Sequence, residues 1–336
     1  MRYYIFLGLL LLYSYHITGQ VNADISFEKT RGQIENKVII NWLEQDEAKW
    51  QQENLPRLDV MAVKCDLQSS VLPVSHFNVS VYSFILPEKN DAEILLEIQD
   101  MAADEVLTLI DAGTGRTIFT SVNQQKKKYL LPALNPDNIR LEWRNNIDTN
   151  YTSRFSISRI FIHQSPIDRG GPTIGFNTAL PCIPNAACKQ DSILQLISKS
   201  TVRIRMVMEE GIGWCSGSFI NNTRNDKTPY ILSAYHCTFN YTPYYDLWRF
   251  DIEYKADSCS NPSSEPNYFS LTGCERRAGR QESDFVLLEL EVDPPANYEI
   301  TFAGWRKDES MTPDTSYLFH HPNADIRKIS ICTNKA

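Results

Sequence analysis

Residues 229–237 of the 336-residue chain read PYILSAYHC. This apolar run ends in small residues and is followed by His236 and Cys237. A short apolar run bounded by turn signals is typical of a buried β-strand. A histidine at the end of such a strand is usually structural. It can also act as a general base when an acid orients it and a nucleophile lies close by. The flanking sequence decides between these two roles.

The sequence on both sides of this strand is also rich in short apolar segments. Many short strands with few helical stretches predict a β-barrel or sandwich from about Cys182 to the end of the chain. The segment DSILQLISKSTVRIRMVM leads into the strands, and the further strand candidates are GWCSGSFINN, LWRFDIEYKA, SDFVLLELEV, EITFAGWR, TSYLFHHP and IRKISIC.

A second β-rich region comes earlier in the chain. Alternating apolar residues from about Val71, with AGTG and NPDN as turns, predict an antiparallel β-sandwich that ends near residue 164. Residues 20–60 before it are polar and charged, with a weak helical period in NWLEQDEAKWQQENLPRL that ends at Pro56. Residues 165–181 are rich in Gly and Pro and lack periodicity, so they are predicted to be a linker between two domains.

The N-terminus has the features of an export signal. Arg2 supplies a positive charge, residues 5–12 form an apolar core, and Gly19 is a small residue at a plausible cleavage site. This pattern predicts a secretory signal peptide over residues 1–19 and an extracellular protein. The apolar core is too short to span a bilayer, so no membrane span is expected.

The charge balance argues against one class of partner. The formal net charge is -8, whereas a nucleic-acid-binding protein needs a basic face for the phosphates. The basic run at residues 126–128 is predicted to be a solvated loop.

The cysteines fit an oxidising compartment. Seven of the eight lie between Cys182 and Cys332, and Cys65 stands apart in the first half. Clustered cysteines in an exported protein favour disulfides. A zinc site is the alternative, but no C-x-x-C or H-x-x-x-H spacing supports it. No metal and no cofactor are therefore predicted.

Three features favour a catalytic role for His236. Ser233 and Ala234 are small, which leaves room for close packing beside the ring. Cys215 and Cys237 are placed to form a disulfide that would clamp two adjacent strands and fix the loop that carries the imidazole. Asp284 directly precedes an apolar strand, where an inward-pointing and unpaired carboxylate would be costly. Asp284 therefore either faces water or accepts a hydrogen bond from His236, which would fix the tautomer of the imidazole.

The motifs CSGSFINN, YILSAYHC and SDFVLLEL together resemble the chymotrypsin-fold serine endopeptidases. The motifs NNTRND at 221–226, AGW at 303–305 and HHPN at 320–323 are similar to those of the bacterial lysyl endopeptidases. This resemblance covers about residues 182–336, and the preceding sandwich is similar to that family's pro-region. It implies an all-β fold in which an antiparallel β-sandwich pro-region is followed by an incomplete trypsin-like double β-barrel.

The resemblance also implies roles for individual residues. His236 would be the general base of a secreted protease that hydrolyses peptide bonds in protein or peptide substrates, and Asp284 would be its orienting acid. Ser218 falls on the strand before the histidine and is not the nucleophile. The family pattern pairs Cys215 with Cys237.

The remaining disulfides also follow from the resemblance. Cys188 would pair with Cys259, and Cys182 with a cysteine beyond the end of this chain. Cys274 and Cys332 have no counterpart in the family pattern, so they either pair with each other or stay free. In the first case Cys65 would be free.

Two adjacent histidines, His320 and His321, need a separate interpretation. Side chains of adjacent residues alternate between the faces of a strand, so these two cannot both point into one site. They are predicted to be structural. A metal-dependent hydrolase that uses them is a weaker alternative, since no ligand motif accompanies them.

The family's nucleophile lies in a G-x-S-G-x loop, which this sequence does not contain. The serines after Asp284 are Ser310, Ser316 and Ser330, and none has flanking glycines. The resemblance therefore predicts a precursor truncated before its catalytic serine, without the oxyanion hole and specificity pocket, and inactive as given. Its pro-region would contact the peptidase domain, and Arg169 is a candidate cleavage site. The alternative is an exported, non-enzymatic binding protein that uses the sandwich.

Overall fold

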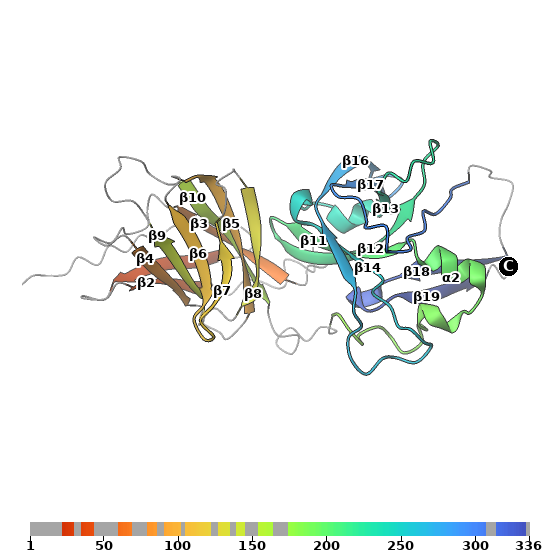
Figure 1. Ribbon diagram of the computed structural model, residues 1–336, viewed down its shortest axis with the longest axis horizontal. Coiled ribbons are helices and arrows are strands. Elements are labelled where there is room, and N and C mark those ends of the chain that lie inside the picture. Colours follow the sequence, from red (N-terminus) through yellow and green to blue (C-terminus); the bar gives the residue numbers. More distant parts are fainter. Residues whose placement is uncertain are drawn as a thin grey trace, which may run out of the picture. The chain divides into compact units, whose positions relative to one another are not determined.

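The structure is a computed structural model, and it describes residues 22–29, 35–43, 60–68, 79–85, 91–101, 105–121, 127–134, 139–144, 154–163, 174–306 and 314–333. The chain divides into two compact units, drawn in Figure 1: residues 1–49 and 61–164 form the first, and residues 50–60 and 165–336 form the second. The predicted signal peptide, Arg169 and Ser310 lie outside the described residues. No helix among the described residues is long and apolar enough to cross a membrane.

The first unit contains two sheets of mainly antiparallel strands. One has the order β1-β2-β4-β9-β6-β7, with a parallel pairing between β2 and β4. In the other, β3, β10, β5 and β8 are neighbours in that order. The strands are β1 (Asn22–Lys29), β2 (Glu35–Leu43), β3 (Val60–Gln68), β4 (Val79–Ile85), β5 (Asp91–Asp100), β6 (Val106–Asp111), β7 (Arg116–Thr120), β8 (Lys127–Leu134), β9 (Ile139–Arg144) and β10 (Arg154–His163).

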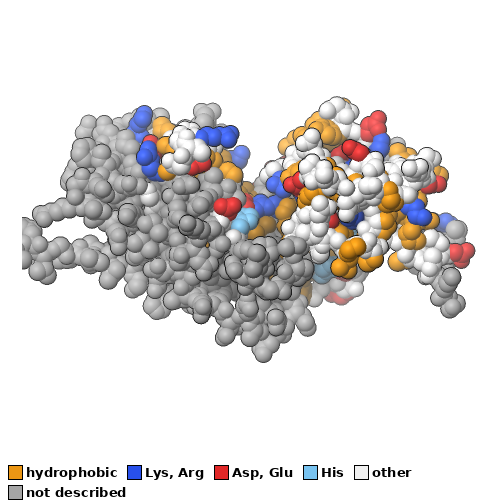
Figure 2. Space-filling model, turned by 90° about the horizontal axis from the view of Figure 1, so that it is seen from below, with side chains coloured by type: hydrophobic (Ala, Val, Ile, Leu, Met, Phe, Trp, Pro, Cys, Tyr) orange, Lys and Arg blue, Asp and Glu red, His pale blue; other side chains and the backbone are white. Residues whose placement is uncertain are grey.

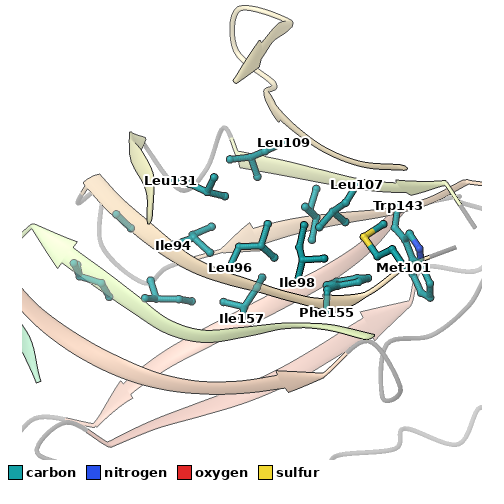
Figure 3. Packing of buried hydrophobic residues seen from close by; sticks show 14 residues of the cluster. Ile94, Leu96, Ile98, Met101, Leu107, Leu109, Leu131, Trp143, Phe155 and Ile157 are labelled. Carbon is teal, nitrogen blue, oxygen red and sulfur yellow. The ribbon is translucent and has the colours of Figure 1, made fainter. Parts of the chain in front are cut away.

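The core of the first unit is made of residues that alternate along strands of both sheets. Ile94, Leu96 and Ile98 come from β5, and they lie in one cluster with residues of β6, β9 and β10 (Figure 3). The rings of Trp143 and Phe155 meet edge to face, with their centroids 5.2 Å apart. This alternation buries one face of each sheet, as expected of a sandwich.

Two details of the first unit differ from the sequence-based expectation. The strands begin well before Val71, because β1, β2 and β3 precede it. The first residues of the predicted helical segment, 41–43, are the end of β2. The run KVII within β2 favours extended backbone, and sheet pairing outweighs the weak helical period.

The basic run also differs from the prediction of a loop. Lys127 and Lys128 are the first residues of β8, and the Lys127 ammonium lies 5.6 Å from the centre of the Tyr129 ring. Lys127 and Tyr129 are two residues apart and therefore lie on the same face of the strand, which places the ammonium group over the ring. The side chain of Lys127 is exposed, so the strand takes in a charged residue without burying it.

The second unit is built on one curled antiparallel sheet that forms a half-barrel (Figure 1). Its strand order is β15-β14-β11-β12-β13-β17-β16, and β18 and β19 form a separate hairpin. The all-β fold predicted from the sequence is confirmed. The elements are η3 (Ala186–Cys188), α2 (Ser192–Ser198), β11 (Thr201–Met208), β12 (Gly211–Ile220), β13 (Tyr230–Ser233), η4 (Tyr235–Thr238), η5 (Tyr245–Leu247), β14 (Arg249–Ile252), β15 (Phe269–Thr272), β16 (Cys274–Arg280), β17 (Phe285–Leu290), β18 (Thr315–His320), η6 (Pro322–Ala324) and β19 (Lys328–Thr333).

One predicted strand in this unit does not form, and two strands were not predicted. EITFAGWR makes a single bridge, from Ala303 to Ile220 of β12. The N–H of Ala303 donates to the carbonyl of Phe219, and the carbonyl of Ala303 accepts the N–H of Asn221. The ring of Phe302 packs against that of Phe219. The segment is therefore attached to the sheet at one point. Strand β15 has only four residues and strand β16 is strongly charged, so neither has an apolar pattern that predicts a strand.

The last part of the predicted linker is fixed to the second unit. The backbone N–H of Gly175 donates to the carbonyl of Asn323, at 2.8 Å. The N–H groups of Asn177 and Ala179 donate to the carboxylate of Asp325, both at 2.9 Å. Residues 174–181 are therefore a docked part of this unit, and only the stretch before them remains a candidate tether.

The surface of the second unit carries several large apolar side chains. Figure 2 shows hydrophobic side chains interspersed with polar ones on one face of this unit. Helix α2 exposes Ile193, Leu196 and Ile197, which are spaced as one helical stripe. The hairpin exposes Tyr317 and Leu318. An apolar stripe that faces solvent is unusual for a helix at the surface of a folded domain.

Replacing a core residue of the sandwich should lower the stability of the first unit. Leu107 is fully buried in the cluster of Figure 3. Leu107→Ala leaves a cavity, so we expect the free energy of unfolding to fall by about 2–5 kcal/mol. Urea denaturation followed by far-ultraviolet circular dichroism measures this change. The control is Thr120→Ser at an exposed position of β7, which should shift stability by less than about 0.5 kcal/mol. Equal effects of the two variants would contradict the proposed core.

Candidate active site

His236 lies just outside the sheet, in the 3-10 turn η4. Strand β13 stops at Ser233, where its pairing with β17 also ends. The sequence predicted the histidine at the strand end itself, and the structure places it one short turn further on. As a consequence the imidazole projects from the edge of the sheet, and 67% of its side-chain surface is exposed.

Asp284 contacts His236 twice. One carboxylate oxygen, Oδ1, accepts the backbone N–H of His236 at 2.8 Å, and Oδ2 lies 2.7 Å from the ring atom Nδ1. Asp284 occupies the turn that enters β17 and has a φ of 47°, in the left-handed region. An aspartate tolerates this conformation better than most residues do. The turn therefore directs both carboxylate oxygens at one residue.

This geometry determines which nitrogen of the imidazole can act as a base. The hydrogen bond from the imidazole, and after it the one from the backbone N–H of His236, lowers the pKa of Asp284 below its usual value. An ionised carboxylate can only accept, so in the neutral imidazole Nδ1 carries the proton and Nε2 keeps its lone pair. The sequence left open whether Asp284 faces water or binds His236. It does both, because half of its side chain is exposed.

A disulfide holds the other end of the histidine turn. Cys215 of β12 is bonded to Cys237, the residue after His236. The bond joins a strand to a 3-10 turn, whereas the sequence suggested two adjacent strands. A second disulfide joins Cys188 of η3 to Cys259. Both pairs are those that the family resemblance implied.

Three other cysteines of this unit are free. Cys182 and Cys332 are exposed, and Cys274 is buried with its thiol 3.5 Å from the carbonyl oxygen of Tyr245. Burial raises the pKa of the Cys274 thiol. Cys274 and Cys332 do not form a disulfide with each other. Cys274 is the first residue of β16 in the curled sheet, whereas Cys332 lies in the β18–β19 hairpin. The side chain of Cys65 lies outside the described residues.

None of the serines singled out in the sequence is bonded to His236 in the described part of the chain. Ser218 lies within β12, opposite Leu232. Ser316 and Ser330 belong to the β18–β19 hairpin. The hydroxyl of Ser330 is 2.9 Å from Nε2 of His320. The structure thus places the imidazole of His236 against the carboxylate of Asp284, and none of these described serines is hydrogen-bonded to that pair.

The two adjacent histidines have different surroundings. His320 is half-buried beside Ser330, whereas His321 is buried. The Nδ1–H of His321 donates to the carbonyl of Asp325 at 2.9 Å, and its ring lies 6.1 Å from that of Tyr254, centroid to centroid. Among the described residues, no group of three or more acidic, cysteine or histidine side chains is arranged to hold a metal ion.

Sequence reasoning missed the role of Ser233. In the sequence it is only a small residue that leaves room beside the imidazole. In the structure its hydroxyl donates to the carbonyl oxygen of Ser216 at 2.8 Å and lies 3.5 Å from the sulfur of Cys215. The sequence did contain a hint of this hydrogen bond, because Ser216 in CSGS and Ser233 in ILSAYHC are small polar residues on strands that are otherwise apolar. Their pairing, however, depends on the strand register.

The stability of the second unit should fall in mildly acidic solution. Burial, and then the charge of Arg327, lowers the pKa of His321 well below its usual value. Below about pH 6.5 the unfolded chain binds a proton that the folded chain does not, so stability falls with pH by up to about 1.4 kcal/mol per pH unit. Above that pH this contribution is fully present. Urea denaturation from pH 8 to pH 5 measures the slope.

The matched variant is His321→Asn, whose side-chain N–H can replace the Nδ1 donor but does not titrate. It should have a shallower slope than the unmodified protein between pH 6.5 and pH 5, and the same slope above pH 7. Identical slopes throughout would show that His321 is not the acid-sensitive group.

The part of the chain that carries the site also matches known proteins. Residues 176–336 match the family model of the lysyl endopeptidase C-terminal domain. A lysyl endopeptidase of Pseudomonas aeruginosa is 25% identical over an alignment of 253 residues, and this alignment covers 71% of this chain and 54% of that protein. The chain thus spans about half the length of the curated relative it matches. His236 and Asp284 both fall within the matched domain. The chain is therefore similar to lysyl endopeptidases, and residues 176–336 resemble the C-terminal domain of that family.

Proposed function

We propose that this chain is part of a secreted serine endopeptidase precursor, with His236 as its general base and Asp284 as the acid that orients it. The observation that carries this proposal is the pair of hydrogen bonds from His236, one from its backbone and one from its ring, to a single carboxylate. A merely structural ion pair at the surface does not need this double contact, because one contact is enough to pair the charges.

The proposed chemistry follows from the free Nε2 atom. It takes the proton of a serine hydroxyl as the oxygen attacks the peptide carbonyl, and it later gives that proton to the leaving amine. Asp284 keeps the proton on Nδ1 and stabilises the imidazolium formed between the two steps. The side chain of His236 is 67% exposed, so the ring is accessible from solvent.

The nucleophile, the oxyanion hole and the specificity pocket are proposed to lie in sequence outside these 336 residues. The exposed apolar side chains of α2 and the β18–β19 hairpin support this, since such surfaces usually pack against further structure. By itself the chain is proposed to be inactive on peptides. The relative is named a lysyl endopeptidase, so cleavage after lysine is the first preference to test.

The first unit is proposed to be the pro-region of the precursor. Its sandwich has its own buried core, and residues 174–181 are fixed to the second unit, so a cut that separates the units would fall between them. Arg169 is the candidate site. Contact between pro-region and peptidase unit, and export by the N-terminal signal, are parts of the same proposal.

A direct test is to sequence the source locus beyond codon 336 and to assay both products on lysine-containing peptides. The 336-residue chain should show no hydrolysis. A longer frame with a G-x-S-G segment should be active. In that longer protein, Asp284→Asn should lower kcat by about 10⁴-fold and His236→Ala by about 10⁶-fold.

The control for these variants is Glu282→Gln, which changes an exposed acid two residues from Asp284 and should leave kcat unchanged. Activity retained by His236→Ala would overturn the assignment. A stop codon directly after Ala336, together with a soluble and inactive product, would instead favour the non-enzymatic binding protein.

A further inference from the structure

We infer that a chain of hydrogen bonds from Asp325 through His321 and Ser216 positions the turn that carries His236. The inference rests on the proposed function only in taking His236 as the catalytic base. It assigns a positioning role to residues that neither contact His236 nor belong to the family motif of the histidine strand.

The first link is the carboxylate of Asp325, which is only 1% exposed. Its Oδ1 accepts the backbone N–H of Asn177, and its Oδ2 accepts that of Ala179. Lys328, also buried, lies 3.9 Å from Oδ2. A buried carboxylate is costly unless it is hydrogen-bonded and paired, so this one holds residues 177–179 firmly in place.

The second link crosses the turn at residues 321–325. The carbonyl of Asp325 accepts the Nδ1–H of His321, and the backbone N–H of His321 donates to the hydroxyl of Ser216 at 2.8 Å. Within this turn Asn323 and the buried Ala324 both have positive φ, at 50° and 58°. Left-handed backbone is unfavourable for alanine and persists only where surrounding contacts enforce it. The bonds between residues 175–179 and the turn are such contacts.

The third link reaches both flanks of His236. The carbonyl of Ser216 accepts the hydroxyl of Ser233, three residues before His236. Ser216 also follows Cys215, whose disulfide holds Cys237, directly after His236. One residue of β12 is therefore tied to both ends of the turn that presents the imidazole.

Packing alone fixes the imidazole poorly, because its side chain is largely exposed. An exposed ring is oriented mainly by hydrogen bonds and by the backbone that carries it. Every hydrogen bond between Asp325 and Ser233 in this chain involves a buried or partly buried side chain. A displacement of Asp325 is therefore expected to change the hydrogen bonds that hold Ser233. Demonstrating this coupling needs a readout at His236 itself.

The experiment measures hydrogen exchange by NMR in the full 336-residue chain, at the backbone amide of His236 and at its Nδ1 proton. Both protons are bonded to Asp284, so they report whether the turn keeps its geometry. Ser216→Ala removes the acceptor of the His321 N–H. We expect exchange at His236 to become about tenfold faster, as expected for the loss of one hydrogen bond, while amides of β11 stay protected.

The matched control is Ser218→Ala on the same strand, for which the structure gives no side-chain hydrogen bond among the described residues. It should leave exchange at His236 unchanged, and Ser216→Thr, which keeps the hydroxyl, should restore protection. Asp325→Asn, which weakens the first link, should act like Ser216→Ala. It also serves as the test if Ser216→Ala does not fold.

Unchanged exchange at His236 in Ser216→Ala or in Asp325→Asn would overturn the inference. An equal rise across all amides of the second unit would also overturn it, because that pattern shows general destabilisation. The exchange measurement does not use peptidase activity. If the proposed function is wrong, the activity assay will show it, and the exchange rates at His236 still test the hydrogen-bonded chain.

Discussion

The two hydrogen bonds between Asp284 and His236 are the contact on which the interpretation of this site depends. They require a left-handed turn at the start of β17 and a 3-10 turn at the end of β13, on neighbouring antiparallel strands. Because the pairing of these strands ends at Ser233 and Val286, both turns leave the sheet at the same edge. The sheet register thus brings together two residues that are far apart in the sequence.

The site is exposed, and polar contacts and a disulfide support it more than packing does. The Cys215–Cys237 bond and the hydroxyl of Ser233 hold the histidine turn to β12. Behind β12, the buried groups of His321 and Asp325 link the same strand to residues 177–179. The segment before Cys182 is therefore a structural part of the peptidase-like unit, although its Gly- and Pro-rich sequence has the composition of a linker.

Much of the fold could be read from the sequence, because alternation of apolar residues reports directly which face of a strand is buried. Strands β4 to β10 lie between about Val71 and residue 164, where alternating apolar residues predicted the sandwich. The errors fall where local pattern and tertiary pairing disagree. Strands β1 to β3 lie before the predicted start of the sandwich, and the end of β2 falls in the segment with a weak helical period. EITFAGWR has strand composition but makes only one bridging contact.

The sequence by itself determined the all-β class, the two β-rich regions and His236 and Asp284 as the residues to examine, since these depend on residue type and local spacing. Only the tertiary structure decided that Asp284 binds both the backbone and the ring of His236, that Cys274 and Cys332 stay apart, and that Asp325 anchors residues 177–179. Those outcomes depend on strand register and on turns with positive φ, which bring distant residues within hydrogen-bond distance and which no local pattern encodes.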